Sequence, residues 1–258
     1  MTALENVTAR PTGAALTVSL LGTPSVQRDG ERVKPPRGHK PWALLAYTLL
    51  TEVPPSRQQL AGLLFQDADD PFGALRWSLS QLRRLFGDSA IVGGDPLRVA
   101  LPAGALVDVE ILVKGTWVEA VALPGIGRPL MEGVDVRMSP AFDLWLENER
   151  RHVAGLTEAV LHEAALASLA RGAAEVAVDH ASRLVALNPL DENAQVLLVR
   201  CLRAAGRPED AARQVKAATK LLKEELGVGP SPALRTAAAP SQESVRHVGG
   251  RAAILAKL

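Results

Sequence analysis

Apolar residues recur every three or four positions between Asp70 and Gly87, which predicts an amphipathic helix. Asp70 suits the residue that caps the start of a helix, Pro71 suits the first helical position, and Gly87 suits the residue just past the end. At about 100° per residue, one stripe collects five apolar side chains: Phe72, Leu75, Leu79, Leu82 and Phe86. The opposite face carries Trp77, Ser80, Gln81 and Arg84, and it is flanked by Arg76 and Arg83. Such a face suits a DNA major groove, and an ordinary amphipathic surface helix is the alternative.

The residues ahead of this helix predict a small antiparallel sheet and two further helices. Leu16 to Leu21 has the pattern of a short strand, and the Asp29-Gly30 pair inside residues 26–33 is typical of a type I′ hairpin turn. Residues 41–50 predict a buried helix that begins at a proline. Ser56 and Gln59 have the spacing of a capping box, which predicts a second, short helix.

The residues that follow predict a second hairpin. Residues 90–92 and 97–101 are strand candidates, and a Gly-Gly-Asp-Pro turn separates them. A sheet, three helices and a hairpin follow one another in a winged helix-turn-helix, in which the third helix enters the major groove and the hairpin is the wing. The segment from Asp70 to Gly87 is the third helix in this order.

The second half of the chain has a helical pattern. Asp108 is a possible cap for a helix that runs toward Trp117 and Val121, and residues 141–170 predict a long helix. The Gly- and Pro-rich stretch between them, residues 122–140, has no regular pattern.

An internal repeat follows the long helix. Gly172 and Gly206 are 34 residues apart, and so are Ala177 and Ala211. A period of 34 residues, with Gly at the turn, Ala five residues later and Pro189 at the end of the unit, is the tetratricopeptide pattern. Small residues at positions 177 and 211 allow paired helices to approach closely.

Composition limits the possible functions. A net charge of +1 over 258 residues means that a nucleic-acid site depends on local clusters of cations. The arginines between Asp70 and Gly87 form one such cluster, and residues 28–40 contain a second. A single cysteine, Cys201, excludes an internal disulfide and fits a reducing compartment, where we expect it on the packed face of a helix. We recognise neither a signal peptide nor an apolar span of about 20 residues, so we expect a cytoplasmic protein without membrane contact.

The sequence contains no recognisable catalytic or cofactor-binding motif. There is no phosphate-binding glycine loop, no nucleophile paired with a base, and the histidines are scattered along helices. We therefore expect no enzymatic activity, no cofactor and no metal site.

Five strings together resemble the Streptomyces antibiotic regulatory protein family, in which a winged helix-turn-helix precedes a bacterial transcriptional activator domain. They are LLGTPSVQRDGERV, ALRWSLSQLRRLFG, LRVALPAGALVDVE, FDLWLENER and LNPLDENAQVLLVRCLRAAGRPEDAARQ with LLKEELGVGPSPALR, and they cover about residues 16–236. The resemblance implies a mainly α fold with a small β component. It also implies a DNA-binding activator that binds repeats upstream of a promoter and contacts RNA polymerase. A homodimer on double-stranded DNA is compatible with this arrangement.

The resemblance places base contacts on the outward face of the third helix. We expect these contacts from Trp77, Ser80, Gln81 and Arg84, with Arg84 as the best candidate for a bidentate contact to guanine. Arg76 and Arg83 flank this face and are phosphate candidates, with ion pairs to Asp69 or Asp88 as the alternative. The expected phosphate contacts are Arg37, Lys40, Arg57, Arg76, Arg83 and Arg98.

Four segments are expected along the chain. They are a flexible N-terminus (1–15), the winged helix-turn-helix (16–106), the tetratricopeptide-like activator domain (107–236), and a tail or the start of a further helical region (237–258). Whether the native chain continues beyond Leu258 is left open by the sequence. The competing function is a tetratricopeptide-type interaction protein whose winged helix is structural or docks a protein, which the near-zero net charge favours.

Overall fold

The structure is a computed structural model that describes residues 16–87, 90–134 and 139–238. It has two compact units, Met1–Thr157 and Glu158–Leu258, and each is treated separately below. The expected domain boundary at residue 106 stays a prediction, and the expected N-terminal segment 1–15 and the residues after 238 lie outside the described residues.

The first unit begins with a small sheet. Its strands are β1 (Leu16–Ser19), β2 (Ser25–Arg28), β3 (Glu31–Arg32) and β6 (Leu106–Val107), in the order β3-β2-β1-β6. The β2–β3 turn has positive φ at both Asp29 and Gly30, as a type I′ turn requires. The sequence pattern did not predict β6, which pairs in parallel with β1.

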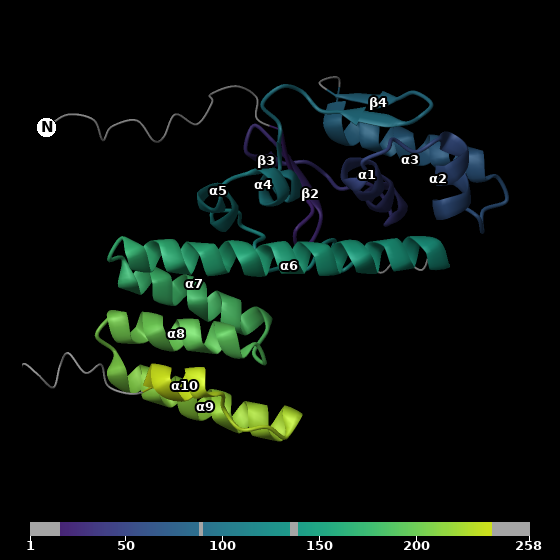
Figure 1. Cartoon of the computed structure of the whole chain (residues 1–258). Coiled ribbons are helices and arrows are strands. Elements are labelled where there is room, and N and C mark those ends of the chain that lie inside the picture. Colours follow the sequence, from purple (N-terminus) through teal and green to yellow (C-terminus); the bar gives the residue numbers. More distant parts are fainter. Residues whose placement is uncertain (1–15, 88–89, 135–138, 239–258) are drawn as a thin grey trace, which may run out of the picture. The chain divides into compact units, whose positions relative to one another are not determined.

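Three helices and a hairpin follow the first three strands (Figure 1). The helices are α1 (Lys40–Leu50), α2 (Arg57–Leu64) and α3 (Pro71–Phe86), and the hairpin pairs β4 (Ile91–Gly93) with β5 (Arg98–Ala100). The capping box of Ser56 and Gln59 is present, the Asp70 side chain accepts the Gly73 N–H, and Gly87 ends α3 at a φ of 65°. These signals are therefore confirmed, and the N-terminal region has the predicted winged architecture.

The buried face of α3 makes the core of this helical group. Leu75, Leu79, Leu82 and Phe86 have at most 1% of their surface exposed. Phe72, which was placed on the same stripe, is 47% exposed. It lies in the first turn of α3.

The predicted helix from Asp108 to Val121 is two helices, α4 (Asp108–Lys114) and α5 (Trp117–Val121). The break lies at Gly115 and Thr116, where the backbone is extended and Thr116 forms a capping box with Glu119. The side chain of Asp108 does not cap a long helix. It accepts hydrogen bonds of 2.9 Å from the Leu20 and Leu21 N–H groups, and so joins the end of β1 to the start of α4.

The long helix α6 (Pro140–Ala170) is present as predicted. Its first half packs in the first unit, where Phe142 and Trp145 contact the Tyr47 ring and Arg150 donates to the carbonyls of Leu130 and Met131. Among the described residues, α6 is the one helix that is long and apolar enough to cross a membrane by length and composition, with a mean hydropathy of 1.2 over an 18-residue window. A core helix meets this criterion equally well, so the expectation of a protein without membrane contact stays a prediction.

The second unit stacks the helices of the repeat. These are α7 (Ala174–Leu187), α8 (Glu192–Ala204), α9 (Pro208–Leu226) and α10 (Pro232–Ala238), and α10 packs on α8 and α9 (Figure 1). Ala177 and Ala211 are buried, and Gly172 and Gly206 have φ angles of 74° and 73° in equivalent turns. The 34-residue repeat is thus a pair of similar helical hairpins. The sequence pattern did not predict α10.

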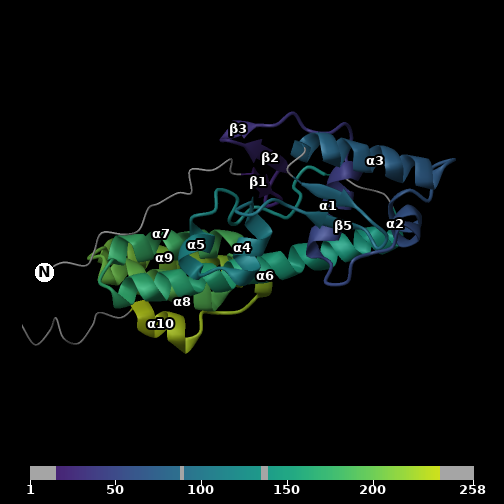
Figure 2. The same cartoon turned by 90° about the horizontal axis from the view of Figure 1, so that it is seen from above.

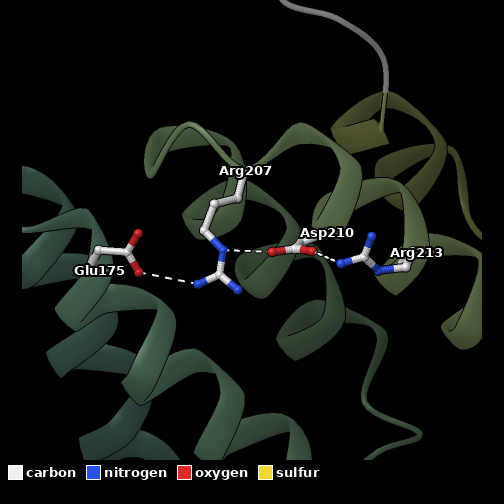
Figure 3. A network of polar contacts seen from close by, with 4 residues as sticks. All are labelled: Glu175, Arg207, Asp210 and Arg213. Atoms are coloured by element: carbon white, nitrogen blue, oxygen red, sulfur yellow. Dashed lines mark hydrogen bonds and ion pairs between the residues drawn. The ribbon is translucent and has the colours of Figure 1, made fainter.

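A polar network joins the first turn of α7 to the start of α9 (Figure 3). The guanidinium of Arg207 donates to Asp210 at 2.7 Å and to Glu175 at 3.2 Å, and Arg213 also pairs with Asp210. The hydrogen bond from Arg207 lowers the pKa of the Asp210 carboxyl. Because the Glu175 and Arg213 side chains are largely exposed, the ion pairs that they make contribute little to stability.

Candidate nucleic-acid interface

The outward face of α3 carries the side chains that were expected to contact bases. Trp77 is 47% exposed and Arg84 is exposed, while Ser80 and Gln81 are half-buried. The Ser80 hydroxyl donates to the Trp77 carbonyl at 2.7 Å, so it offers a ligand its oxygen lone pairs. Arg84 makes no hydrogen bond or ion pair with any residue that the structure describes. Its five donors remain available for a partner.

The hairpin β4–β5 lies beside α3, and Arg83 and Arg57 fix it there (Figures 1 and 2). The Nε of Arg83 donates to the Val92 carbonyl of β4 at 3.0 Å. The Nε of Arg57, at the start of α2, donates to the Gly94 carbonyl at 2.9 Å. In both residues the terminal guanidinium nitrogens make no hydrogen bond with any described residue, so they can still contact a phosphate.

The turn of the hairpin also caps α2. The backbone N–H of Arg57 donates to the Asp95 carboxylate at 3.0 Å. A carboxylate is favourable at this end of a helix because the first N–H groups have no partner within the helix. Polar contacts therefore join the hairpin both to helix α2 and to helix α3.

The remaining cations lie around this face. Arg98 on β5 and Arg37 are exposed. The Nζ of Lys40 lies 5.1 Å from the centre of the Phe65 ring, a cation–π contact. Arg76 pairs with Asp70 at 3.3 Å, with both side chains about two-thirds exposed. The alternative to a phosphate role for Arg76 is thus an ion pair with Asp70 rather than with Asp69, and Asp88 lies outside the described residues.

A cavity of about 440 Å³ brings the end of the basic segment 28–40 against α3. Arg37, His39 and Lys40 line it on one side, and Phe65 and Trp77 on the other. Sequence reasoning missed His39 and Phe65 because nothing local connects them to α3. It also missed Ser78, whose buried hydroxyl has no hydrogen-bond partner among the described residues.

No group of three or more His, Cys, Asp or Glu side chains in the described part of the chain is placed to hold a metal ion. The chemistry available on this face is that of cations, hydrogen-bond donors and aromatic surface. These groups suit a nucleic acid, which has anionic phosphates and flat bases with polar edges.

Two comparisons with known proteins bear on the chain. Residues 114–239 match the family model described as the bacterial transcriptional activator domain. A solved structure, "Mycobacterium tuberculosis EmbR in complex with low affinity phosphopeptide", has a similar fold with a TM-score of 0.59. The two sequences are 19% identical, and the match covers 94% of this chain and 71% of that chain. Among curated proteins, none matches the sequence.

Proposed function

We propose that the chain is a transcriptional regulator of the Streptomyces antibiotic regulatory type, and that it binds double-stranded DNA with sequence specificity. The match of residues 114–239 to the bacterial transcriptional activator domain supports this family. One observation carries the proposal. Arg84 and Trp77 stand exposed on α3 beside a hairpin that Arg57 and Arg83 already hold in place.

In this proposal the residues have two kinds of role. Arg84 is the main base contact, with Trp77, Ser80 and Gln81 beside it in the major groove. Arg37, Lys40, Arg76 and Arg98 contact phosphates. Arg57 and Arg83 position the wing through Nε and meet phosphates through their terminal nitrogens. Phosphate contacts fix the position of the protein on the duplex, and base contacts discriminate sequence.

We expect a cytoplasmic protein that activates transcription. A regulator of this kind would bind repeats upstream of a promoter as a homodimer, and its repeat domain would contact RNA polymerase. The family name of residues 114–239 supports this part of the proposal.

The test compares Arg84→Ala with Arg98→Ala on a duplex selected from random DNA by the wild-type protein. We expect Arg84→Ala to lose about 1–3 kcal/mol on the selected duplex and almost nothing on random DNA, since a bidentate base contact discriminates by that amount. We expect Arg98→Ala to weaken both duplexes equally and to reduce the slope of log K against log salt by about one unit. Fluorescence anisotropy at several salt concentrations measures both effects.

Arg200→Ala is the control, because Arg200 is an exposed arginine on α8 in the second unit. Equal losses on selected and random DNA for Arg84→Ala would contradict the base contact. A wild-type protein that selects no sequence would contradict the function, and would favour the interaction protein instead.

A further inference from the structure

A large cavity in the first unit lies away from the proposed DNA interface. It measures about 910 Å³ and lies between the four-stranded sheet and the segment from α4 to Arg128. Pockets for small ligands in proteins usually have volumes of about 300–1,000 Å³. The cavity is therefore large enough for a ligand of ordinary drug size.

The sheet presents a polar wall to this cavity. Thr17 lies opposite Gln27 and Ser19 lies opposite Ser25 in the register of β1 and β2, and all four side chains line the cavity. A sheet face that other elements cover is usually apolar. Here none of the four side chains has a hydrogen-bond partner among the described residues, although three of them are half-buried. The wall consequently offers several free donors and acceptors.

The opposite wall is mainly apolar. It comprises Ile111, Leu123, Pro124 and the backbone of Gly125. A side chain at position 125 would meet the Leu21 carbonyl at 2.5 Å, so the loop is fixed close to the end of β1. An occupant would thus meet hydroxyl groups on one side and hydrocarbon on the other.

One cation at the cavity is available to pair with an anion. Both acids are already engaged: Asp108 accepts the backbone N–H groups of Leu20 and Leu21, and Glu119 caps α5. Arg128 pairs with Glu132, with its Nε at 2.9 Å from the carboxylate. Arg32 lines the cavity and has no hydrogen bond or ion pair with any described residue. The Arg32 guanidinium is thus left without an ion-pair partner among the described residues.

We propose that this cavity is a binding site for a small amphipathic anion. The acidic group of the ligand pairs with Arg32, its polar atoms meet Ser19 and Ser25, and its apolar surface packs on Leu123 and Pro124. Such a ligand would contact both the N-terminal sheet and residues 119–128, which lie inside the matched family region. The proposal is independent of DNA binding, because no residue of the proposed interface lines the cavity.

The experiment uses two fluorescent probes on the full chain. Anilinonaphthalene sulfonate carries an aromatic surface and one negative charge, and phenylnaphthylamine has the same rings without the charge. We expect the sulfonate to bind at one site, and Arg32→Gln to weaken it about tenfold, which corresponds to about 1.4 kcal/mol. Phenylnaphthylamine should bind the wild type and Arg32→Gln equally.

Lys34→Gln is the matched control, since Lys34 is exposed two residues further along the chain and does not line the cavity. Ser25→Phe should fill the cavity and abolish binding of both probes, and Ser25→Val should remove one hydroxyl while the fold is retained. Circular dichroism and the urea midpoint report whether each variant is folded. Absence of sulfonate binding to the wild type, equal weakening by Lys34→Gln and Arg32→Gln, or unchanged binding to a folded Ser25→Phe variant would each overturn the proposal.

Discussion

The Cys201 side chain is fully buried on α8, and its burial raises the pKa of the thiol to about 11. Only the thiolate is a good nucleophile, so we expect the native protein to react with iodoacetamide at pH 8 far more slowly than the protein in urea does. Mass spectrometry of the alkylated chain at successive times measures this difference. Rapid alkylation of the folded protein would show that Cys201 is accessible.

His180 on α7 is also buried, with 8% of its surface exposed, and its Nδ1 has no partner among the described residues. Burial lowers the pKa of this imidazole, against a smaller opposing effect of Asp179. The unfolded chain therefore takes up the proton first, so the free energy of unfolding falls as the pH is lowered from 6.5 toward the lower pKa of the folded state.

The comparison of wild type with His180→Gln tests this. Urea midpoints at pH 7.5 and pH 5.5 should differ more for the wild type, because the variant has no imidazole to titrate. An equal pH dependence in both proteins would assign the effect to another group.

At the scale of elements, the contact between β1 and α4 depends on one carboxylate. The two oxygens of Asp108 together accept three backbone N–H groups, of Leu20, Leu21 and Val109. Its burial raises the pKa of the carboxyl, and these hydrogen bonds oppose that effect. An asparagine at this position would turn an amide NH₂ toward backbone donors.

We therefore expect Asp108→Asn to lower the free energy of unfolding by about 1–3 kcal/mol, the usual cost of a buried donor left unsatisfied. Chemical denaturation followed by circular dichroism measures it. Glu110→Gln is the control, because Glu110 is exposed on the same helix. Similar midpoints for the two variants would contradict this role of Asp108.

The elements that the sequence predicts are those with a local signal. Each such signal comes from residues that are close in the chain. The signals are the turn at Asp29-Gly30, the helix start at Ser56 and Gln59, and the two ends of α3 at Asp70 and Gly87. The pairing of β6 with β1 joins Val107 to Val18, and no local pattern reports such a contact. The break between α4 and α5 did have a signal, in the Thr116–Glu119 capping box, which a purely periodic interpretation overlooks.

In the candidate site, too, the sequence predicts the local features and not the contacts between distant residues. The helical period alone places Arg84 and Trp77 on the outward side of α3. It does not reveal that Arg83 and Arg57 bond to carbonyls of the hairpin, because those contacts join residues that only the fold brings together.

At the scale of the whole molecule, the net charge of +1 is too small to attract DNA by itself. DNA binding would therefore depend on where the cations lie. We expect the triple variant Arg76→Ala, Arg83→Ala, Arg84→Ala to lose its retention on heparin at low salt. A variant with Arg200, Lys216 and Lys223 changed to alanine should keep it, since these exposed cations lie on α8 and α9.

Both variants remove three positive charges. A difference in the salt concentration at which they elute from heparin therefore reports the effect of where the charges lie, and not of their total number. Loss of retention in both would show that general charge is responsible, and retention of both would leave the α3 arginines without a role in binding.

The bonds from Arg57 and Arg83 to the hairpin have a consequence for the kinetics of DNA binding. Both bonds exist in the protein without DNA, so the wing needs no ordering step after the first encounter. Association with a duplex would then be governed by diffusion and electrostatic attraction, and a weakened wing contact would appear as a slower, second kinetic phase.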